Sequence, residues 1–102
     1  MITIRHHDFG WGGLLTIDGH SGAAEYGTDV VCAGVSSITV TLCRMLDGKY
    51  GCKGSYRSGA GRIQYLTKKK TKPILEFALE GYRWMAEEFP DYITFEETKG
   101  AG

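Results

Sequence analysis

Apolar and polar residues alternate from the start of the chain. Ile2 and Ile4 alternate with Thr3 and Arg5, and this period of two is typical of a half-buried strand. After a glycine-rich turn, β-type residues resume at 14–17. The pattern therefore predicts that the first two strands form a hairpin.

A helical period follows a stretch of small residues. Residues 21–28 are small or turn-forming and show no period, so they are predicted to be a loop. Asp29 is a good N-cap for a helix that spans about residues 29–46. The predicted core face of this helix consists of Val31, Val35, Ile38, Leu42 and Met45.

The second half of the chain shows the same kinds of pattern. Two β-type runs, at about 50–57 and 62–67, flank the turn-forming residues 58–61 and predict a second hairpin. Residues 71–73 suit the cap and first turn of a second helix, which Pro90 ends. Its predicted core face consists of Leu75, Ala78, Tyr82, Met85 and Phe89.

The order of these elements predicts the fold class. Residues 92–95 predict a short final strand, and residues 98–102 are expected to be a frayed tail. The order ββαββα(β) predicts an α+β fold, a two-layer sandwich whose helices cover one face of a mixed or antiparallel sheet. Because 102 residues can enclose one core but not two, residues 1–102 are expected to form a single domain.

Composition excludes several classes of protein. Hydrophobic residues make up 42% and charged residues 24%, which fits a globular chain and neither a disordered nor a fibrous one. No apolar run approaches the roughly 20 residues of a membrane span. The first residues also lack the features of a secretory signal. We therefore expect a cytoplasmic protein without membrane contact.

The cysteines and the paired histidines do not predict a metal site. Three cysteines, an odd count without an export signal, argue against a disulfide framework, and no CxxC pair indicates structural zinc. His6 and His7 lie on opposite faces of a strand, where we expect them to be solvated. Cys43 in a helix and Cys52 in a strand are expected to pack rather than react. We expect no metal and no cofactor.

Cys32 differs from the other cysteines because it lies near the start of the predicted helix. After an Asp29 cap it is the third helical residue, where unpaired amides and the helix dipole favour a thiolate. Core packing is the default interpretation of a lone buried cysteine. A nucleophilic thiol also needs a base, and His20 at the end of the second predicted strand is the best-placed imidazole. Cys32 and His20 are therefore the candidate reactive pair.

Other side chains are candidates for supporting this pair. Ser36 follows Cys32 by one helical turn, so its hydroxyl shares a helix face with the thiol. A carboxylate at Asp29 would oppose a thiolate if it lay near the sulfur, whereas as an N-cap it serves the helix amides, and we favour capping. Trp11 and Tyr26, in predicted loops, are candidates for lining a pocket.

The segment from Gly19 to Ser36 resembles the signature of the Prp family, the ribosomal-processing cysteine proteases. The resemblance rests on Gly19-His20, Glu25-Tyr26-Gly27 and Asp29-Val30-Val31-Cys32-Ala33-Gly34-Val35-Ser36. It implies that His20 and Cys32 form a catalytic dyad, with Asp29 and Ser36 in support. It also implies a flexible loop that gates the site. The candidate loop and substrate-binding residues are Gly19, Gly22, Tyr26 and Gly27.

The resemblance also implies a substrate and partners. Family members remove the N-terminal extension of a large-subunit ribosomal protein beside a pair of phenylalanines, and some process phage capsid and scaffold proteins. They are homodimers, so the expected partners are a protein or peptide substrate and a second copy of the chain. Nucleic acid is expected only through association with the ribosome. Cys52 and the run of lysines depart from the family pattern and leave a host or a phage substrate open.

The distribution of charge leaves two alternatives open. Residues 44–72 hold most of the lysine and arginine, whereas acidic residues dominate 76–97, although the net charge is zero. Arg57, Arg62 and residues 68–72 predict a basic patch, so a non-catalytic ribosome- or RNA-binding dimeric module is the alternative function. A catalytically idle dimeric scaffold is the third hypothesis.

Overall fold

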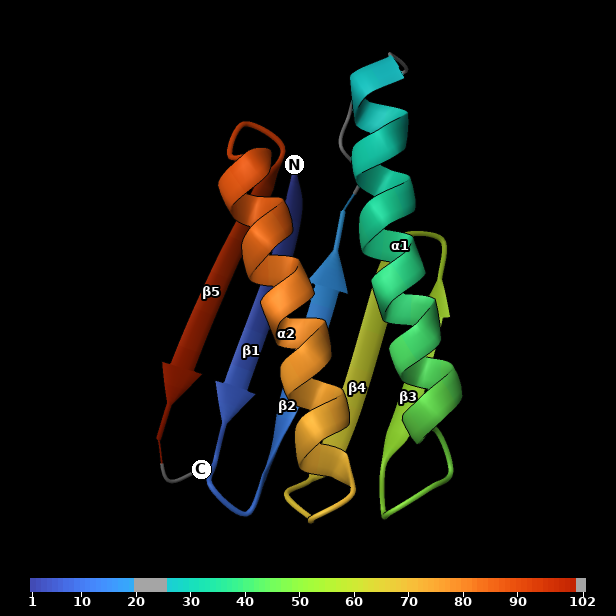
Figure 1. Cartoon of the computed structure of the whole chain (residues 1–102), viewed down its shortest axis with the longest axis vertical. Helices are drawn as coiled ribbons and strands as arrows, with labels where there is room; N and C mark the ends of the chain where they lie inside the picture. Colours follow the sequence, from blue (N-terminus) through green and yellow to red (C-terminus); the bar gives the residue numbers. More distant parts are fainter. Residues whose placement is uncertain (20–25, 101–102) are drawn as a thin grey trace.

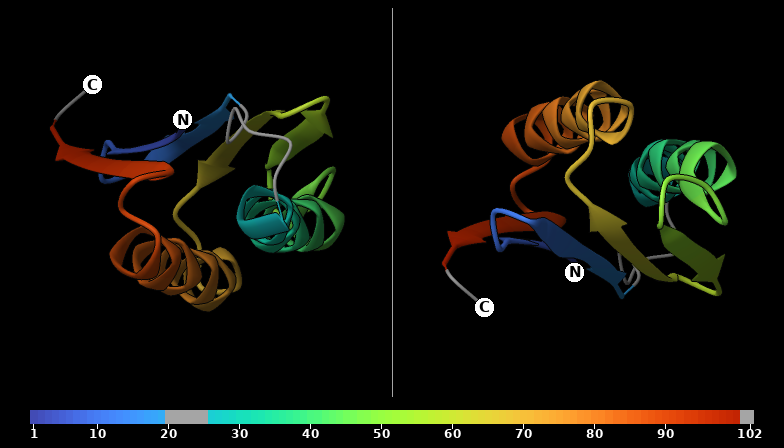
Figure 2. Two further views of the ribbon diagram at one scale, coloured as in Figure 1. Left: turned by 90° about the horizontal axis from the view of Figure 1, so that it is seen from above. Right: turned by 90° about the horizontal axis from the view of Figure 1, so that it is seen from below.

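The computed structural model describes residues 1–19 and 26–100, with residues 26–29 described by their backbone alone. The elements are β1 (Ile2–Asp8), β2 (Gly12–Asp18), α1 (Tyr26–Leu46), β3 (Lys53–Arg57), β4 (Ala60–Leu66), α2 (Thr71–Glu88) and β5 (Ile93–Lys99). One five-stranded sheet has the order β3-β4-β2-β1-β5. Both helices cover the same face of it (Figure 1, Figure 2). The predicted two-layer α+β fold is therefore confirmed.

The sheet is mixed because its first and last strands in sequence run parallel. β1 pairs antiparallel with β2, β2 with β4, and β4 with β3, whereas β1 pairs in parallel with β5. Parallel neighbours need a long crossover connection, and α2 leads the chain back to start β5 at the same end of the sheet as β1 (Figure 1). Both predicted hairpins, β1–β2 and β3–β4, are present.

The core lies between the covered face of the sheet and one stripe of each helix. Alternation along β1 and β2 points Ile2, Ile4, Leu15 and Ile17 toward the helices, and each is at most 2% exposed. Burying such a side chain contributes about 1.5–3 kcal/mol, so the period of two decides which face the helices cover. The helices contribute Val31, Val35, Leu42, Leu46, Leu75, Ala78, Leu79, Tyr82 and Met85.

A hydrogen bond in the core joins the two helices. Tyr82 of α2 is fully buried, and its Oη lies 2.7 Å from Oγ1 of Thr39 in α1. The Thr39 hydroxyl donates its only hydrogen to the carbonyl oxygen of Val35, 2.7 Å away. Tyr82 must therefore be the donor to Thr39. Burial raises the pKa of Tyr82, so this phenol keeps its proton at neutral pH.

The start of α1 and the end of β5 differ from the sequence prediction. Helix α1 begins at Tyr26, three residues before the predicted start at Asp29. Strand β5 continues to Lys99, although residues 98–102 were expected to be a frayed tail. The extension follows the partner strand, because the pairing of β5 with β1 runs on to Asp8.

The core face of α1 also ends one residue later than predicted. Met45 is 46% exposed, whereas Leu46 is fully buried. The spacing explains this difference, because Leu46 follows Leu42 by four residues and so returns to the same face of a helix with 3.6 residues per turn. The prediction for Met45 was therefore wrong.

The second hairpin has a shorter turn than predicted. Its two turn residues, Ser58 and Gly59, have φ angles of 50° and 80°, as a type I′ turn requires. Ala60 and Gly61 belong to β4, not to the turn. Cys52 lies immediately before β3 and is 2% exposed, so it packs as predicted but outside a strand.

His6 is buried, although the sequence predicted a solvated side chain. Its position follows the alternation of Ile2 and Ile4, which places it on the covered face at 7% exposure. Its Nε2 lies 2.7 Å from Oη of Tyr65, and its Nδ1 lies 3.6 Å from Oε1 of Glu97. Burial lowers the pKa of His6 more than the Glu97 carboxylate raises it. The imidazole is therefore neutral at pH 7.

The groups around His6 decide which ring nitrogen carries the proton of the neutral imidazole. Arg83 donates two hydrogen bonds to Glu97, of 3.0 and 2.7 Å, and holds the pKa of that carboxyl below its usual range. Burial raises the pKa of Tyr65 to about 12, with a smaller contribution from Asp8. With Nδ1–H directed toward Glu97, the Tyr65 hydroxyl donates to Nε2.

The buried His6 predicts that the protein becomes less stable as the pH is lowered. Its folded pKa lies below the ordinary value of 6.5, so the unfolded chain binds the proton more readily. The free energy of unfolding should therefore decrease as the pH falls from about 7.5 to about 5.5. Urea denaturation at these two pH values measures the decrease. His6→Gln should be less stable at neutral pH but should lose less stability over this interval, and an equal loss in both proteins would contradict the assignment.

Candidate functional site

A pocket of about 300 Å³ opens beside α1, near the end of β2 and the turn between β3 and β4. We call it the Cys32 pocket, and it is lined by Ile2, Ile17, Gly19, Cys32, Val35, Ser36, Tyr56, Ser58 and Gly59. Figure 1 shows the carboxyl end of β2 beside α1. The pocket thus joins segments that are far apart in the sequence, with apolar side chains from the core and hydroxyl groups from α1, β3 and the turn.

Cys32 is half-buried and lines the pocket from the second turn of α1. The predicted N-cap role of Asp29 is wrong, because the helix begins at Tyr26 and Asp29 is its fourth residue. Only the first four N–H groups of a helix lack a partner within it, so the amide of Cys32 belongs to the helix interior. The dipole acts mainly on the first turn. The helix-start amides that the sequence predicted to serve Cys32 therefore lie in the turn before it.

Ser36 lies one helical turn after Cys32, as predicted, and both residues line the pocket. Its Oγ forms a hydrogen bond of 2.7 Å with Oη of Tyr56 in β3. Both side chains are half-buried. This bond connects the helix that carries the thiol to the strand at the edge of the sheet.

Tyr56 is a pocket residue that sequence reasoning did not assign to the site. It is directly opposite Gly61 in the β3–β4 pairing. A Cβ at Gly61 would lie 3.0 Å from Cδ1 of Tyr56 and 3.0 Å from Cγ2 of Thr39, so a side chain at this position would press on the ring. The sequence offered no signal for this pairing, because the predicted turn spanned residues 58–61 and so placed Gly61 outside the strand.

Gly19 lines the pocket at the end of β2 with a φ of 98°. This left-handed conformation is open to glycine at little cost. A Cβ at this position would also collide with the carbonyl oxygen of Met1. The backbone geometry therefore requires glycine here, and the assignment of Gly19 to the site stays a prediction.

The other predicted site residues fall partly or wholly outside the described residues. His20 and Gly22 lie outside them. Tyr26, Gly27 and Asp29 are in the first turn of α1, but their side chains are not described. The structure therefore brings Cys32, Ser36 and Gly19 together and leaves the assignment of His20 as a prediction.

The remaining cysteines have different surroundings from Cys32. Burial raises the pKa of Cys43, and the nearby Asp47 adds to this effect, so its thiol resists ionisation. Cys52 is in the core. Neither residue lines the Cys32 pocket. Trp11 does not line it either, because it precedes β2 while Gly19 follows it, and its ring is 63% exposed and stacks on Phe9.

Two further observations concern the described part of the chain. Among residues 1–19 and 26–100, no three His, Cys, Asp or Glu side chains are grouped so that they could hold a metal ion. Neither of the two helices in these ranges has the length and hydropathy to cross a membrane. The polar groups that the described residues bring to the Cys32 pocket are a thiol, hydroxyls and backbone groups.

Solved structures of similar chains have the same fold. SMU.848 from Streptococcus mutans is 26% identical, with a TM-score of 0.78 over 97% of this chain and 95% of that one. An essential ribosomal processing protease Prp from S. aureus, in complex with a substrate peptide, is 23% identical, with a TM-score of 0.81 over 96% of this chain and 100% of that one. The same protease with a covalently linked product peptide has a TM-score of 0.78 at 23% identity, with the same coverage.

Comparison at the level of sequence identifies the family. No curated protein matches the chain. The family model for the cysteine protease Prp matches residues 1–94, which include Gly19, Cys32, Ser36 and Tyr56. The match covers β1 to α2 and the start of β5. The chain therefore belongs to the Prp family of cysteine proteases.

Proposed function

We propose that this protein is an endopeptidase in which Cys32 is the nucleophile and His20 is the general base and acid. The observation that carries the proposal is the position of Cys32 in a pocket of a chain that belongs to the Prp family. A thiol in such a pocket is within reach of a peptide that enters from solvent. Gly19, the residue before His20, lines the same pocket and supports the choice of base.

The reaction proceeds through a thioester. His20 accepts the thiol proton, and the sulfur of Cys32 attacks the carbonyl carbon of the scissile peptide bond. The C–N bond then breaks, and the leaving amine takes the proton from His20. His20 next accepts a proton from water, whose oxygen attacks the thioester and releases the carboxyl product and the thiol. The covalently linked product peptide of the S. aureus relative supports this scheme.

Membership of the family supports a proposal for the substrate class. The S. aureus relative is a ribosomal processing protease that binds a substrate peptide, and we propose that this chain removes the N-terminal extension of a large-subunit ribosomal protein. Ile2, Ile17 and Val35 give the pocket an apolar surface that suits a hydrophobic side chain. Such a substrate places the enzyme in the cytoplasm. We also propose the homodimer that the family resemblance implies.

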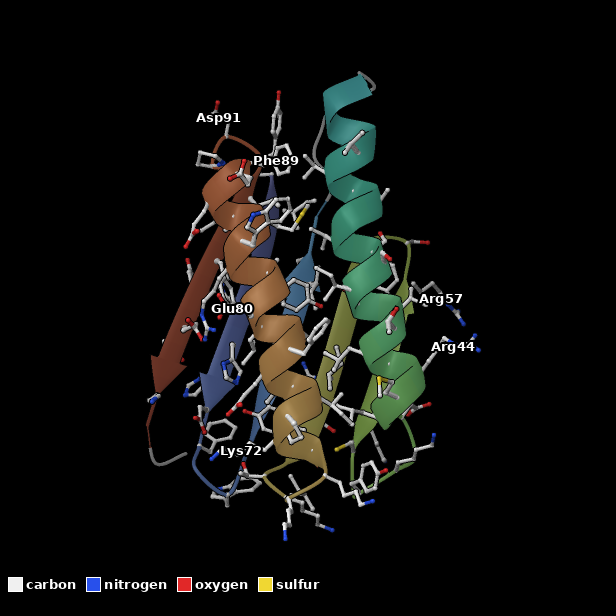
Figure 3. The ribbon with its side chains drawn as sticks, in the orientation of Figure 1. Arg44, Arg57, Lys72, Glu80, Phe89 and Asp91 are labelled. Carbon is white, nitrogen blue, oxygen red and sulfur yellow. The ribbon has the colours of Figure 1, made fainter. Side chains whose placement is uncertain are left out.

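The structure does not strengthen the alternative of an RNA-binding module. That hypothesis rested on one basic patch between Arg57 and the run of lysines. Figure 3 shows Arg57 on the side of β3 and Lys72 on the first turn of α2, well apart. Residues 68–70 lie in the exposed loop before α2. Arg57 and Lys72 therefore do not lie in one local patch.

Replacing the nucleophile tests the proposed function. Cys32→Ser should lower cleavage of a peptide that spans the extension and its Phe-Phe pair by at least about a thousandfold, because a serine hydroxyl is a much weaker nucleophile. Cleavage is measured by mass spectrometry of the products. Cys43→Ser is the matched control and should cleave at the wild-type rate. A phage scaffold peptide that is cleaved in preference would revise the substrate, whereas cleavage that persists in Cys32→Ser would overturn the proposal.

Thiol alkylation tests the role of His20. Iodoacetamide should modify Cys32 at neutral pH at least about tenfold faster than it modifies Cys43 in the same sample. His20→Ala should slow modification of Cys32 toward the rate of an ordinary thiol and leave that of Cys43 unchanged. Peptide mapping by mass spectrometry reads both sites. Equal rates for Cys32 in the two proteins would exclude His20 as the base.

A further inference from the structure

We infer that the end of the molecule opposite the Cys32 pocket binds single-stranded RNA. Trp11 precedes β2, whereas Gly19, at the other end of this strand, lines the Cys32 pocket. We call the end around Trp11 the hairpin surface, and it consists of three stacked rings and four lysines, namely His7, Phe9, Trp11, Lys69, Lys70, Lys72 and Lys99. The inference goes beyond the proposed function, and only the choice of RNA rests on it, because ribosomal proteins assemble on RNA.

The three rings of the hairpin surface stack on one another. The centroids of His7 and Phe9 are 4.6 Å apart with an interplanar angle of 30°, and those of Phe9 and Trp11 are 5.5 Å apart with an angle of 15°. A tight turn keeps the last two rings together. In this turn the N–H of Phe9 donates to the carbonyl oxygen of Gly12, and Gly10 has a φ of 92°. The stack therefore ends in an indole ring whose orientation is set by the hairpin.

The indole of Trp11 offers an open face to a nucleobase. The side chain is 63% exposed, although one face of its ring lies against Phe9. Such a ring contributes little to the core, whereas a base can continue the stack from the open face. Bases in a duplex already stack on each other, so an aromatic platform selects unpaired nucleotides. The stack therefore favours a single strand.

The lysines of the hairpin surface come from segments that meet at this end of the sheet (Figure 1). The N–H of Thr67 donates a hydrogen bond of 3.0 Å to the carbonyl oxygen of Trp11, and the run of lysines starts at the next residue. Lys72, at the start of α2, and Lys99, at the end of β5, line a pocket of about 370 Å³ together with Gly10. Positive charge therefore lies beside the stacked rings.

This positive charge is only partly cancelled by nearby carboxylates. The four lysines are exposed, and none of them forms an ion pair with a residue that the structure describes. Asp8 and Glu76 line the same pocket, whereas the carboxylate of Glu97 is paired with Arg83. The remaining excess of positive charge suits the phosphate groups of a nucleic acid strand. An acidic protein segment would also meet the lysines, but it would leave the indole without a ring to stack on.

The hairpin surface differs from the basic patch that the sequence predicted. That patch joined the lysines to Arg57, which lies on the side of β3 (Figure 3). The hairpin surface needs no residue of β3, and it belongs to an enzyme rather than to a non-catalytic module. Its use would be to hold the protease on RNA while the Cys32 pocket, at the other end, stays open to a peptide.

A labelled single strand tests the inference. Fluorescence anisotropy should show that the protein binds a fluorescein-labelled oligouridine of about twelve nucleotides. Neutralisation of four phosphates predicts that the affinity falls by about fiftyfold for a fourfold rise in salt concentration. Trp11→Ala should lower the affinity by about tenfold, the effect of one lost base stack. Trp11→Phe, which keeps an aromatic face, should retain most of the affinity.

Matched controls separate the hairpin surface from net charge and from exposed rings elsewhere. Trp84 is also exposed but lies near the other end of α2, so Trp84→Ala should bind as the wild type does. Lys69→Gln combined with Lys70→Gln should weaken binding and reduce its salt dependence. Arg44→Gln combined with Arg57→Gln makes the same change in net charge away from the hairpin surface and should have little effect (Figure 3). Thermal unfolding checks that every variant is folded at the assay temperature.

Contrary results are distinct for the inference and for the proposed function. The inference is overturned if the wild type does not bind the oligouridine, if Trp11→Ala binds it equally well, or if a duplex RNA of the same length binds as tightly. Polyglutamate that binds as tightly as the oligouridine would identify an acidic protein as the partner and also overturn it. None of these results affects cleavage of the extension peptide, which Trp11→Ala should perform at the wild-type rate. Cleavage that persists in Cys32→Ser would reject the proposed function and leave the RNA measurements unchanged.

Discussion

The rotation of α1 about its own axis is the constraint on which the site depends. Val31 and Val35 are at most 1% exposed and hold one side of the helix against the sheet. Cys32 and Ser36 each follow one of these valines, about 100° around the helix, and so lie at the edge of the buried stripe. A different rotation would expose the valines at a cost of about 1.5–3 kcal/mol each. The packing that stabilises the fold therefore also aims the thiol at the pocket.

Two tyrosine hydroxyls from other elements of the fold form hydrogen bonds with α1. Tyr82 reaches Thr39 from α2 inside the core, and Tyr56 reaches Ser36 from β3 beside the pocket. Each bond joins α1 to an element that is distant in sequence. A thiol on a helix fixed in this way is held in one position, which is the advantage of a site built on regular elements.

Sequence patterns predicted most elements because each pattern depends on local side chains. The period of two along β1 and the helical stripe through Val35 and Leu42 needed no knowledge of the partners they pack against. The predictions were wrong where contacts with a segment distant in sequence determine the length of an element or the burial of a side chain. Strand β5 is long because β1 offers it backbone groups up to Asp8, and His6 is buried because its strand position outweighed its polarity.

In the site too, features that depend on neighbouring residues were predicted, whereas features that depend on contacts between distant segments were not. Cys32 and Ser36 share a helix face, and this could be read from their spacing. The contribution of Tyr56 required the pairing of two strands and the approach of β3 to α1, which no local pattern contains. The helix dipole was overestimated because the start of α1 was predicted three residues too late. His20 lies outside the described residues and rests on the family signature.

Membership of the Prp family and the position of Cys32 together make covalent catalysis the central claim. The most direct measurement is intact mass spectrometry of the enzyme, quenched with acid during turnover of the extension peptide. The account predicts an added mass equal to the acyl fragment of the substrate, located on Cys32 by peptide mapping. Turnover without a covalent adduct, or an adduct on Cys43 or Cys52, would contradict it.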